Sequence, residues 1–364
     1  KVFFCNSGAE ANEGAIKAAY RYHEGKRKFI LHSETGFHGK LIASGSISGE
    51  YSKKFNFPFF NFGKSFKLND LEFFKQIHAN GNLKDVFAII IETFSASTLT
   101  NVEQNFIEQI KNICKEFDIV LIFDEVYTGW GKTGYMFNFQ RFKNIEPDIL
   151  TISKSLGGGK ASISAYISSD KIFKNTYEKE KDAFLHTSTY NGFSEECVTA
   201  IEAINIALEE DYPSKAKEIE TEIKNNFVQL KKKYPKIIKE IRGSGAIQGI
   251  FFYKQFELIQ SLLKKIDINF LNNNRVFISK IFIAALIEKL YAEHKILAKL
   301  GEKSLSSSES VDDLSYLSID PSLIIQKSDI QYFFKSLDAV LSEGVYKINF
   351  EFISNILKKK LFSS

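Results

Sequence analysis

A lysine and a carboxylate stand just beyond two apolar runs, where a parallel sheet would expose them. Residues 119–123, IVLIF, form an apolar run rich in β-branched side chains, typical of a strand buried on both faces, and Asp124 and Glu125 follow it. A second run, residues 149–152, is followed two positions later by Lys154. Open α/β sheets bind ligands beyond the carboxyl ends of their strands. A lysine partly desolvated there can form a Schiff base, so the pattern predicts that Lys154 and Asp124 contact a cofactor.

The two segments around these residues carry a family resemblance. FDEVYTGWGKTG (residues 123–134) and PDILTISKSLGGG (residues 147–159) resemble the core signature of class III, or ω-type, aminotransferases, which use pyridoxal 5'-phosphate (PLP). That family includes acetylornithine, ornithine, putrescine and 4-aminobutyrate aminotransferases. The resemblance implies that Lys154 carries the internal aldimine and that Asp124 keeps the pyridinium nitrogen protonated, the state in which the ring withdraws electrons. Taken singly, the motifs are also compatible with a surface lysine and an acidic turn.

The amino-terminal segment NSGAEANEGAIKAA (residues 6–19) resembles the phosphate-binding motif of the same family. Ser7 is a plausible N-cap, and the free backbone N–H groups at the start of a helix bind phosphate well. By resemblance, Ser7, Gly8 and Ala9 hold the phosphate of PLP. Without the lysine motif, a Ser-Gly pair before a helix would indicate only a cap.

Further cofactor contacts follow from the resemblance alone. Phe37, in TGFHGK (residues 35–40), matches an aromatic residue that stacks on the PLP ring, as suits a flat electron-poor ring. Val126 matches a residue that packs against the ring, and Tyr127 stands where many relatives have Gln or Met. The complete set of expected cofactor-binding residues is Ser7, Gly8, Ala9, Phe37, His38, Glu92, Asp124, Val126, Tyr127, Lys154 and Thr189.

Three departures from the family pattern concern the substrate. Lys40 replaces an arginine that many relatives use for a substrate carboxylate, which keeps the charge but loses the bidentate fork. Ser318 stands where relatives have a carboxylate-binding arginine, whose loss costs about 2–5 kcal/mol of binding. Residues 93–97, TFSAS, replace the frequent Pro-x-x-Gly-Glu. We therefore assign substrate contact only to Lys40.

The segment HTSTY (residues 186–190) resembles a family segment whose threonine reaches the PLP phosphate of the neighbouring subunit. Thr189 matches that threonine, which implies a homodimer with shared active sites. Alternatively, the segment is an ordinary polar loop. His186 is interpreted as a structural residue.

Composition limits the remaining possibilities. The 364 residues carry a net charge of +4 with dispersed lysines, which favours neither nucleic acid nor a membrane surface as partner. Three scattered cysteines lack metal-type spacing and fit a reducing cytoplasm. No apolar run reaches the roughly 20 residues of a membrane span. Because the chain starts at Lys1, we expect a fragment that lacks an amino-terminal segment.

The order of elements predicts an α/β protein, and the family resemblance implies PLP-dependent transferase fold type I. We expect a large PLP-binding domain with a mostly parallel, seven-stranded sheet at residues 1–212 and a small α+β domain at 213–344. Residues 267–300 are expected to form a helix, residues 305–313 a solvated loop, and residues 345–364 an additional tail of unknown role.

The predicted activity is transfer of an amino group from a primary amine or ω-amino acid to a keto-acid or aldehyde acceptor. Lys154 and Asp124 are the expected catalytic residues. Two alternatives stay open: a PLP-dependent aminomutase or lyase, which needs no second carbonyl substrate, and a PLP-fold scaffold that has lost turnover.

Overall fold

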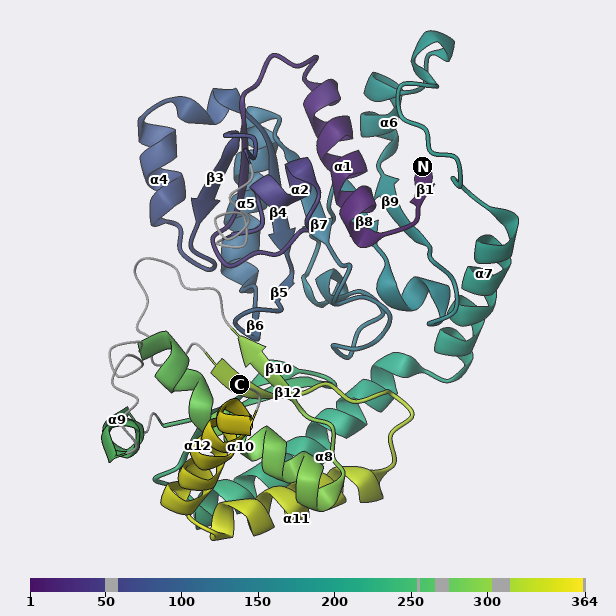
Figure 1. Ribbon diagram of the computed structural model, residues 1–364. Helices are drawn as coiled ribbons and strands as arrows, with labels where there is room; N and C mark the ends of the chain where they lie inside the picture. Colours follow the sequence, from purple (N-terminus) through teal and green to yellow (C-terminus); the bar gives the residue numbers. More distant parts are fainter. Residues whose placement is uncertain (50–57, 254–255, 266–274, 303–314, 363–364) are drawn as a thin grey trace. The chain divides into compact units, whose positions relative to one another are not determined.

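A computed structural model describes residues 1–49, 58–253, 256–265, 275–302 and 315–362 (Figure 1). The chain forms two compact units, Lys1–Ala216 and Lys217–Ser364. Each unit has its own sheet, which is described separately below. The solvated loop expected at residues 305–313 lies outside the described residues.

A seven-stranded sheet forms the centre of the first unit. The order across it is β1 (Val2–Cys5), β9 (Ser164–Ser168), β8 (Ile149–Ile152), β7 (Val120–Asp124), β4 (Val86–Glu92), β2 (Phe29–Ser33) and β3 (Gly63–Phe66). The five strands from β8 to β3 are parallel, whereas β9 is antiparallel to both β8 and β1. The predicted mostly parallel sheet and fold class are confirmed.

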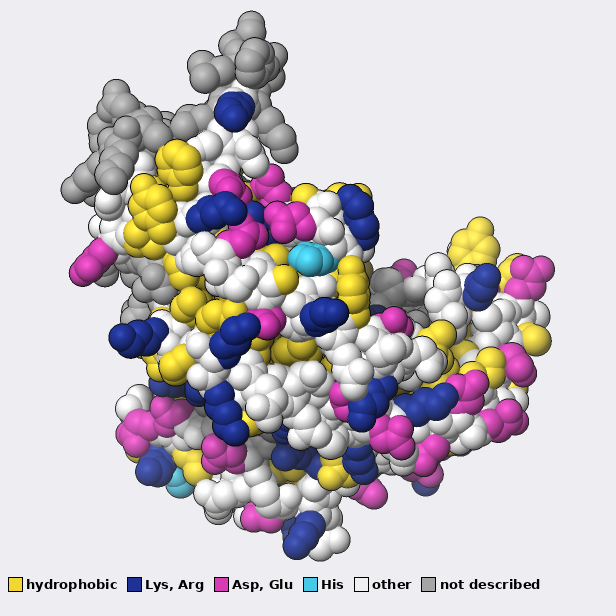
Figure 2. Space-filling model, turned by 90° about the horizontal axis from the view of Figure 1, so that it is seen from below, with side chains coloured by type: hydrophobic (Ala, Val, Ile, Leu, Met, Phe, Trp, Pro, Cys, Tyr) yellow, Lys and Arg dark blue, Asp and Glu magenta, His cyan; other side chains and the backbone are white. Residues whose placement is uncertain are grey.

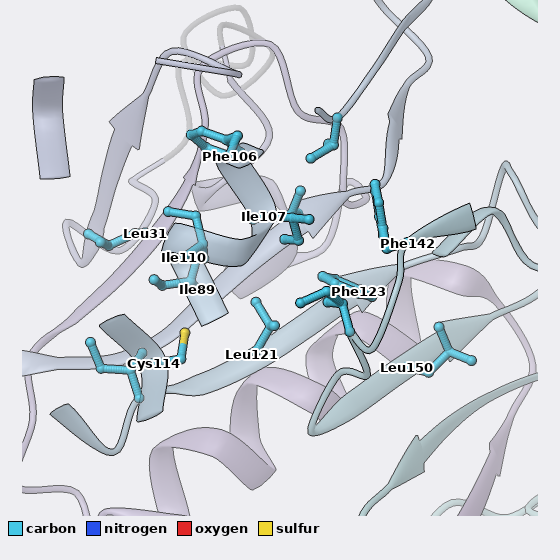
Figure 3. Packing of buried hydrophobic residues seen from close by; sticks show 14 of the residues in the cluster. Leu31, Ile89, Phe106, Ile107, Ile110, Cys114, Leu121, Phe123, Phe142 and Leu150 are labelled. Atoms are coloured by element: carbon cyan, nitrogen blue, oxygen red, sulfur yellow. The ribbon is translucent and has the colours of Figure 1, made fainter. Parts of the chain in front are cut away.

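Helices cover both faces of this sheet because its central strands are apolar on both sides. On one face, α5 (Gln104–Phe117) and α4 (Glu72–Ala79) cover one set of strand side chains. On the other face, α1 (Gly8–Tyr22) contributes its small residues Ala15, Ala18 and Ala19 against the alternate set. Figure 3 shows the first core, in which residues of α5 point at strand residues. The α5 residues are Phe106, Ile107, Ile110 and Cys114, and the strand residues are Leu31, Ile89, Leu121 and Phe123. Burying each such aliphatic or aromatic side chain stabilises the unit by roughly 1.5–3 kcal/mol.

The other elements of the first unit are short, except for one helix. They are α2 (Ile42–Ser46), the two-residue strands β5 (Phe94–Ser95) and β6 (Thr100–Asn101), α6 (Asp170–Thr176) and α7 (Ser194–Glu209). The described residues contain no helix that is both long and apolar enough to cross a membrane.

An antiparallel sheet of four strands forms the second unit, in the order β10 (Ile238–Ser244), β11 (Ile247–Phe252), β13 (Ser315–Ile319) and β12 (Lys299–Glu302). Its helices are most of α8 (Tyr212–Lys233), then α9 (Phe256–Lys265), α10 (Arg275–His294), α11 (Lys327–Ser342) and α12 (Val345–Phe362). The helix expected at residues 267–300 is therefore wrong at its carboxyl end. There α10 stops at His294, Lys295 adopts a left-handed φ of 57°, and the chain enters an edge strand.

An ionic cluster joins α12 to the body of the second unit. The Lys289 ammonium, on α10, lies 2.9 Å from a carboxylate oxygen of Glu343, 2.8 Å from one of Glu351 and 3.1 Å from one of Glu293. Burial alone lowers the pKa of Lys289, but the hydrogen bonds to these three carboxylates outweigh it and raise the pKa above its ordinary value. Figure 2, which looks onto the lower side of the view in Figure 1, shows lysine and acidic side chains interspersed with hydrophobic ones.

We expect Lys289→Met to lower the free energy of unfolding of the full chain by about 1–3 kcal/mol, because it leaves three carboxylates without their shared donor. Urea denaturation measures this change. The matched control is Lys347→Met, which removes an ammonium from the same Glu343 and Glu351 but whose side chain is 57% exposed, against 12% for Lys289. Equal effects of the two substitutions would contradict a structural role for Lys289.

Candidate active site

Three neighbouring strands end in polar side chains that face α1. Glu92 of β4 is paired in register with Asp124 of β7, and Asp124 is paired with Thr151 of β8. Residues directly opposite one another in a sheet project to the same side. All three are buried, so the carboxyl edge of the sheet carries a buried polar row, whereas the residues that precede them in each strand are apolar.

Asp124 lies in the middle of that row and accepts three hydrogen bonds. Its Oδ2 accepts one from the Asn12 amide at 2.7 Å and one from His38 Nδ1 at 2.8 Å, and its Oδ1 accepts one from the backbone N–H of Val126 at 3.0 Å. Burial by itself raises the pKa of Asp124, but the contacts with His38, Val126 and Asn12 outweigh burial and hold the pKa below its ordinary value. Asp124 is therefore an ionised carboxylate fixed in one orientation.

The start of α1 lies against this edge. Ser7 caps the helix, accepting a hydrogen bond from the backbone N–H of Glu10, and its hydroxyl donates to the Glu10 carboxylate at 3.0 Å. The backbone N–H groups of Gly8 and Ala9, in the first helical turn, have no partner within the helix. A Cβ added at Gly8 would come within 2.6 Å of Val126 Cγ1 and 3.3 Å of Ser153 Cβ, so the helix start touches the segments after both β7 and β8.

Lys154 follows β8 in an unusual backbone conformation. Its φ is +50°, in the left-handed region that costs a residue with a side chain about 1–2 kcal/mol. The side chain is exposed, and its ammonium lies 5.4 Å from the centroid of the Tyr127 ring. The carbonyl of Ser153, just before it, accepts a hydrogen bond from the Trp130 indole at 3.0 Å, which ties this turn to the segment after β7. A strained conformation held by its surroundings is frequent at functional positions.

Phe37 and His38 join the two carboxylates from the loop after β2. The backbone N–H of Phe37 donates to Glu92 Oε2 at 3.1 Å, while the His38 ring contacts Asp124. The Phe37 ring is 39% exposed, as a ring that stacks on a ligand requires. Burial raises the pKa of Glu92 to about 7, Asp124 adds to the rise, and His38, the Phe37 N–H and Lys154 oppose it.

The raised pKa of Glu92 predicts a dependence of stability on pH. Its ordinary pKa is 4.5, so between pH 4.5 and about 7 the folded chain holds a proton that the unfolded chain has lost. The free energy of unfolding therefore falls as the pH rises through this window, by up to about 3 kcal/mol. We expect the cofactor-free Glu92→Gln variant to gain stability over the unsubstituted chain as the pH rises from 4.5 to 7. Urea titrations at each pH measure this difference, and the exposed Glu116→Gln is the control. A difference that does not vary with pH would contradict the prediction.

Glu125 is buried beside Asp124 but serves the fold. Its carboxylate accepts hydrogen bonds from the Thr93 hydroxyl at 2.6 Å and from the backbone N–H groups of Asn138 and Phe139 at 3.0 and 2.8 Å, and it also contacts the Thr128 hydroxyl. Every donor belongs to the protein, so Glu125 holds the long turn after β7 in place.

The structure thus brings most of the predicted residues to one edge, whereas Thr189 and Lys40 are exposed. Thr189 lies in the exposed segment 183–193, and no contact among the described residues joins it to Asp124 or Lys154. Lys40 is exposed at the end of the Phe37 loop. The His186 ring packs against Phe3 in a tilted arrangement, with 4.3 Å between ring centroids, and its Nδ1 lies 3.0 Å from the Lys17 ammonium.

Two residues of the site, Asn12 and Thr151, were not predicted from the sequence. Asn12 is the one polar side chain among the buried positions of α1, which are otherwise Ala, Gly and Ile. A buried amide on a face of small apolar residues needs hydrogen-bond partners, so the Asn12 position in the sequence indicates a polar contact inside the fold. Thr151 gave a weaker signal, because a threonine within an apolar strand is common.

Comparison with known proteins identifies the family and fold of the chain. A protein-family model described as aminotransferase class-III matches residues 1–341. Three similar solved structures are an omega transaminase from Pseudomonas jessenii in complex with PMP, an adenosylmethionine-8-amino-7-oxononanoate aminotransferase from Methanocaldococcus jannaschii, and an ornithine aminotransferase from Toxoplasma gondii. Their TM-scores are 0.73, 0.74 and 0.72, at 22%, 24% and 23% identity. The matches cover 96%, 94% and 94% of this chain and 76%, 75% and 74% of those chains. At these identities the likeness is one of fold.

Proposed function

The chain belongs to the class-III aminotransferase family, and from this we propose that its active site is the carboxyl edge of the large sheet, around Asp124 and Lys154. It is a PLP-dependent aminotransferase. The observation that carries the assignment of the site is the buried, ionised Asp124, fixed by three hydrogen bonds at the end of β7, next to β8, which is followed by Lys154.

The residues at this edge fit the parts of PLP. The first turn of α1 offers the N–H groups of Gly8 and Ala9 to a phosphate. Asp124 supplies a carboxylate for a ring nitrogen, and Lys154 an exposed amine for an aldehyde. Phe37 and Val126 offer an aromatic and an aliphatic surface to the ring. Ser7, His38, Glu92 and Tyr127 complete the proposed set within this chain.

Bound PLP supplies a ring that withdraws electrons from the carbon bearing the amino group. Each residue then has a defined task. Asp124, ionised at neutral pH, would keep a proton on the ring nitrogen. Lys154 would hold the cofactor through its amine and, once released by the substrate amine, would serve as base and then acid at the substrate carbon. Glu92, beside Asp124, carries a proton below about pH 7 and so would limit the negative charge at this edge of the sheet.

The substrates that we propose are a primary amine or ω-amino acid as donor and a keto acid or aldehyde as acceptor. Lys40 would contact a substrate carboxylate through a single ammonium in place of a guanidinium fork. Ser318 lies on β13, paired with Gly249 of β11 and Lys299 of β12, and its own hydroxyl carries no charge. Both features favour donors that do not depend on a clamped α-carboxylate.

A single-turnover experiment tests the function. The protein is loaded with PLP, freed of excess and mixed with one amine at a time, without acceptor. We expect conversion of the cofactor to its amine form once per site, together with one equivalent of the carbonyl product. Repeated turnover without any acceptor would instead indicate a lyase or aminomutase, and a loaded protein inert to every class of amine would indicate a scaffold.

We also propose a homodimer with shared active sites, located in the cytoplasm. Support for the dimer is an exposed apolar surface on the segment that carries Thr189 and on α7, comprising Phe184 (85% exposed), Leu185, Tyr190, Val198, Ile201 and Leu208. Contiguous exposed apolar residues typically mark protein interfaces. For the cytoplasm, support is three cysteines that are free and scattered.

Sedimentation tests the dimer. The unsubstituted chain is expected at the mass of two chains, and Val198→Asp combined with Ile201→Asp at the mass of one. Tyr291→Asp, at a residue 58% exposed on α10, is the matched control and keeps the mass of two. A single-chain mass for the unsubstituted protein at micromolar concentration would contradict the proposal.

A further inference from the structure

A chain of buried side chains stands behind Asp124. The Thr151 hydroxyl donates to Asn12 Oδ1 at 2.8 Å, and the Asn12 amide donates to Asp124 Oδ2 at 2.7 Å and to the His38 carbonyl at 2.8 Å. Asn12 and Thr151 are 1% and 0% exposed. These bonds run from the wall of the site to its carboxylate and use all the polar atoms of the Asn12 side chain.

The Thr151 hydroxyl decides the orientation of Asn12. The Asn12 amide group has two N–H donors and one oxygen acceptor, and the two neighbours on its nitrogen side, Asp124 Oδ2 and the His38 carbonyl, both accept. The oxygen therefore needs a donor on the other side, which Thr151 provides. Removing that hydroxyl leaves a buried oxygen unsatisfied and weakens the preference of Asn12 for the orientation that donates to Asp124.

The two carboxylate oxygens of Asp124 differ in the number of hydrogen bonds that they accept. A carboxylate oxygen accepts about two hydrogen bonds. Oδ2 already has two, from Asn12 and His38, whereas Oδ1 has one, from the Val126 N–H. The remaining acceptor position is thus on Oδ1.

The ring of His38 donates to Asp124 through Nδ1. Its Nδ1 lies 2.8 Å from Asp124, which accepts only, so Nδ1 carries a proton. Its Nε2 is buried and has no partner among the described residues. The Nδ1 proton of His38 therefore occupies the second acceptor position of Asp124 Oδ2.

We propose that Asn12 and Thr151 are positioning residues which, together with His38, saturate Oδ2 of Asp124 and leave Oδ1 as the acceptor presented to the pyridine nitrogen. This inference rests on the proposed function. Neither residue touches the cofactor in this arrangement, and both act through the orientation and charge of Asp124. If the two residues only supported the fold, substituting them would weaken the binding of every ligand of the same shape equally. A positioning role predicts weaker binding only for a ligand with a ring nitrogen.

Comparing the binding of PLP with that of an analogue without the ring nitrogen tests the positioning role. Dissociation constants are measured for PLP and for an analogue in which C–H replaces the ring nitrogen, using the full chain and four variants. We expect Asn12→Ala to weaken PLP binding about 10- to 100-fold and Thr151→Val about 3- to 10-fold, since they remove respectively a charge-assisted and a neutral hydrogen bond. Thr151→Ser, which keeps the hydroxyl, recovers most of the affinity. The analogue is expected to bind all variants within about threefold of the unsubstituted chain.

Thr176→Val is the matched control, because Thr176 is also buried in the first unit but donates to the backbone carbonyl of Ile172 in α6. Equal losses for PLP and for the analogue would overturn the positioning role and leave the proposed function standing. Unchanged PLP affinity in both Asn12→Ala and Thr151→Val would do the same. An unsubstituted chain that binds neither compound would overturn the proposed function and this inference together. Thermal unfolding of each cofactor-free variant verifies folding, and Thr151→Val alone decides the question if Asn12→Ala does not fold.

Discussion

The Lys154→Ala variant is expected to lose amino transfer by a factor of about 10² to 10⁴ or more, because one substitution removes both the covalent anchor and the residue that moves the proton. The loss should appear in the single-turnover rate, in which product release plays no part. Stability should change little, since the side chain is exposed and buries little surface.

Borohydride reduction shows whether the loss has the predicted cause. After reduction of the PLP-loaded protein and digestion, we expect the cofactor mass on the peptide that contains Lys154 and on no peptide of the Lys154→Ala variant. The control is Lys160→Ala, which removes an exposed lysine six residues away and should leave both label and rate unchanged. A label on another lysine of the unsubstituted chain would contradict the assignment.

The Asp124→Ala variant is expected to lower the rate of amino transfer about 10²- to 10³-fold, the usual effect of removing a fixed group that stabilises developing charge. The ring nitrogen then loses the carboxylate that keeps it protonated. A cofactor methylated on this nitrogen carries a permanent positive charge and, in the space left by the carboxylate, should recover part of the rate. The same methylated cofactor should not rescue Lys154→Ala.

Substitution of the neighbouring carboxylate, Glu125, is expected to affect stability more than PLP affinity. Glu125→Gln places an amide among the donors that Glu125 now satisfies, Thr93, Asn138 and Phe139 among them, and should lower the free energy of unfolding by about 1–3 kcal/mol. Its effect on PLP affinity should be small. If Glu125→Gln reduced the rate as much as Asp124→Ala without loss of stability, the division of roles between the two carboxylates would be wrong.

The strands that carry the chemistry were predictable because their signal is local. The apolar runs before Asp124 and Lys154 are continuous and β-branched, so both the strands and the residues at their ends followed from the sequence. The fold class followed from the same pattern together with the family resemblance. Asn12 was not found, because its role depends on the distance to Asp124, 112 positions later in the chain, and not on spacing within α1.

The second unit was less predictable for a physical reason. Residues 295–302 follow a strongly helical segment and contain few β-branched side chains, so local preference favours continuing the helix. Pairing of β12 with β13, a contact remote in sequence, overrides that preference. The roles of Thr189 and of the dimer remain predictions, since they require a second chain.

The left-handed backbone of Lys154 also bears on how this chain can evolve. Glycine is the residue that adopts such a φ without steric cost, and it would relieve about 1–2 kcal/mol, part of which its greater freedom in the unfolded chain would offset. Selection for stability alone therefore favours glycine at this position, while selection for chemistry favours lysine. If Lys154 has the proposed role, a gene copy released from catalysis is expected to lose lysine at this position early.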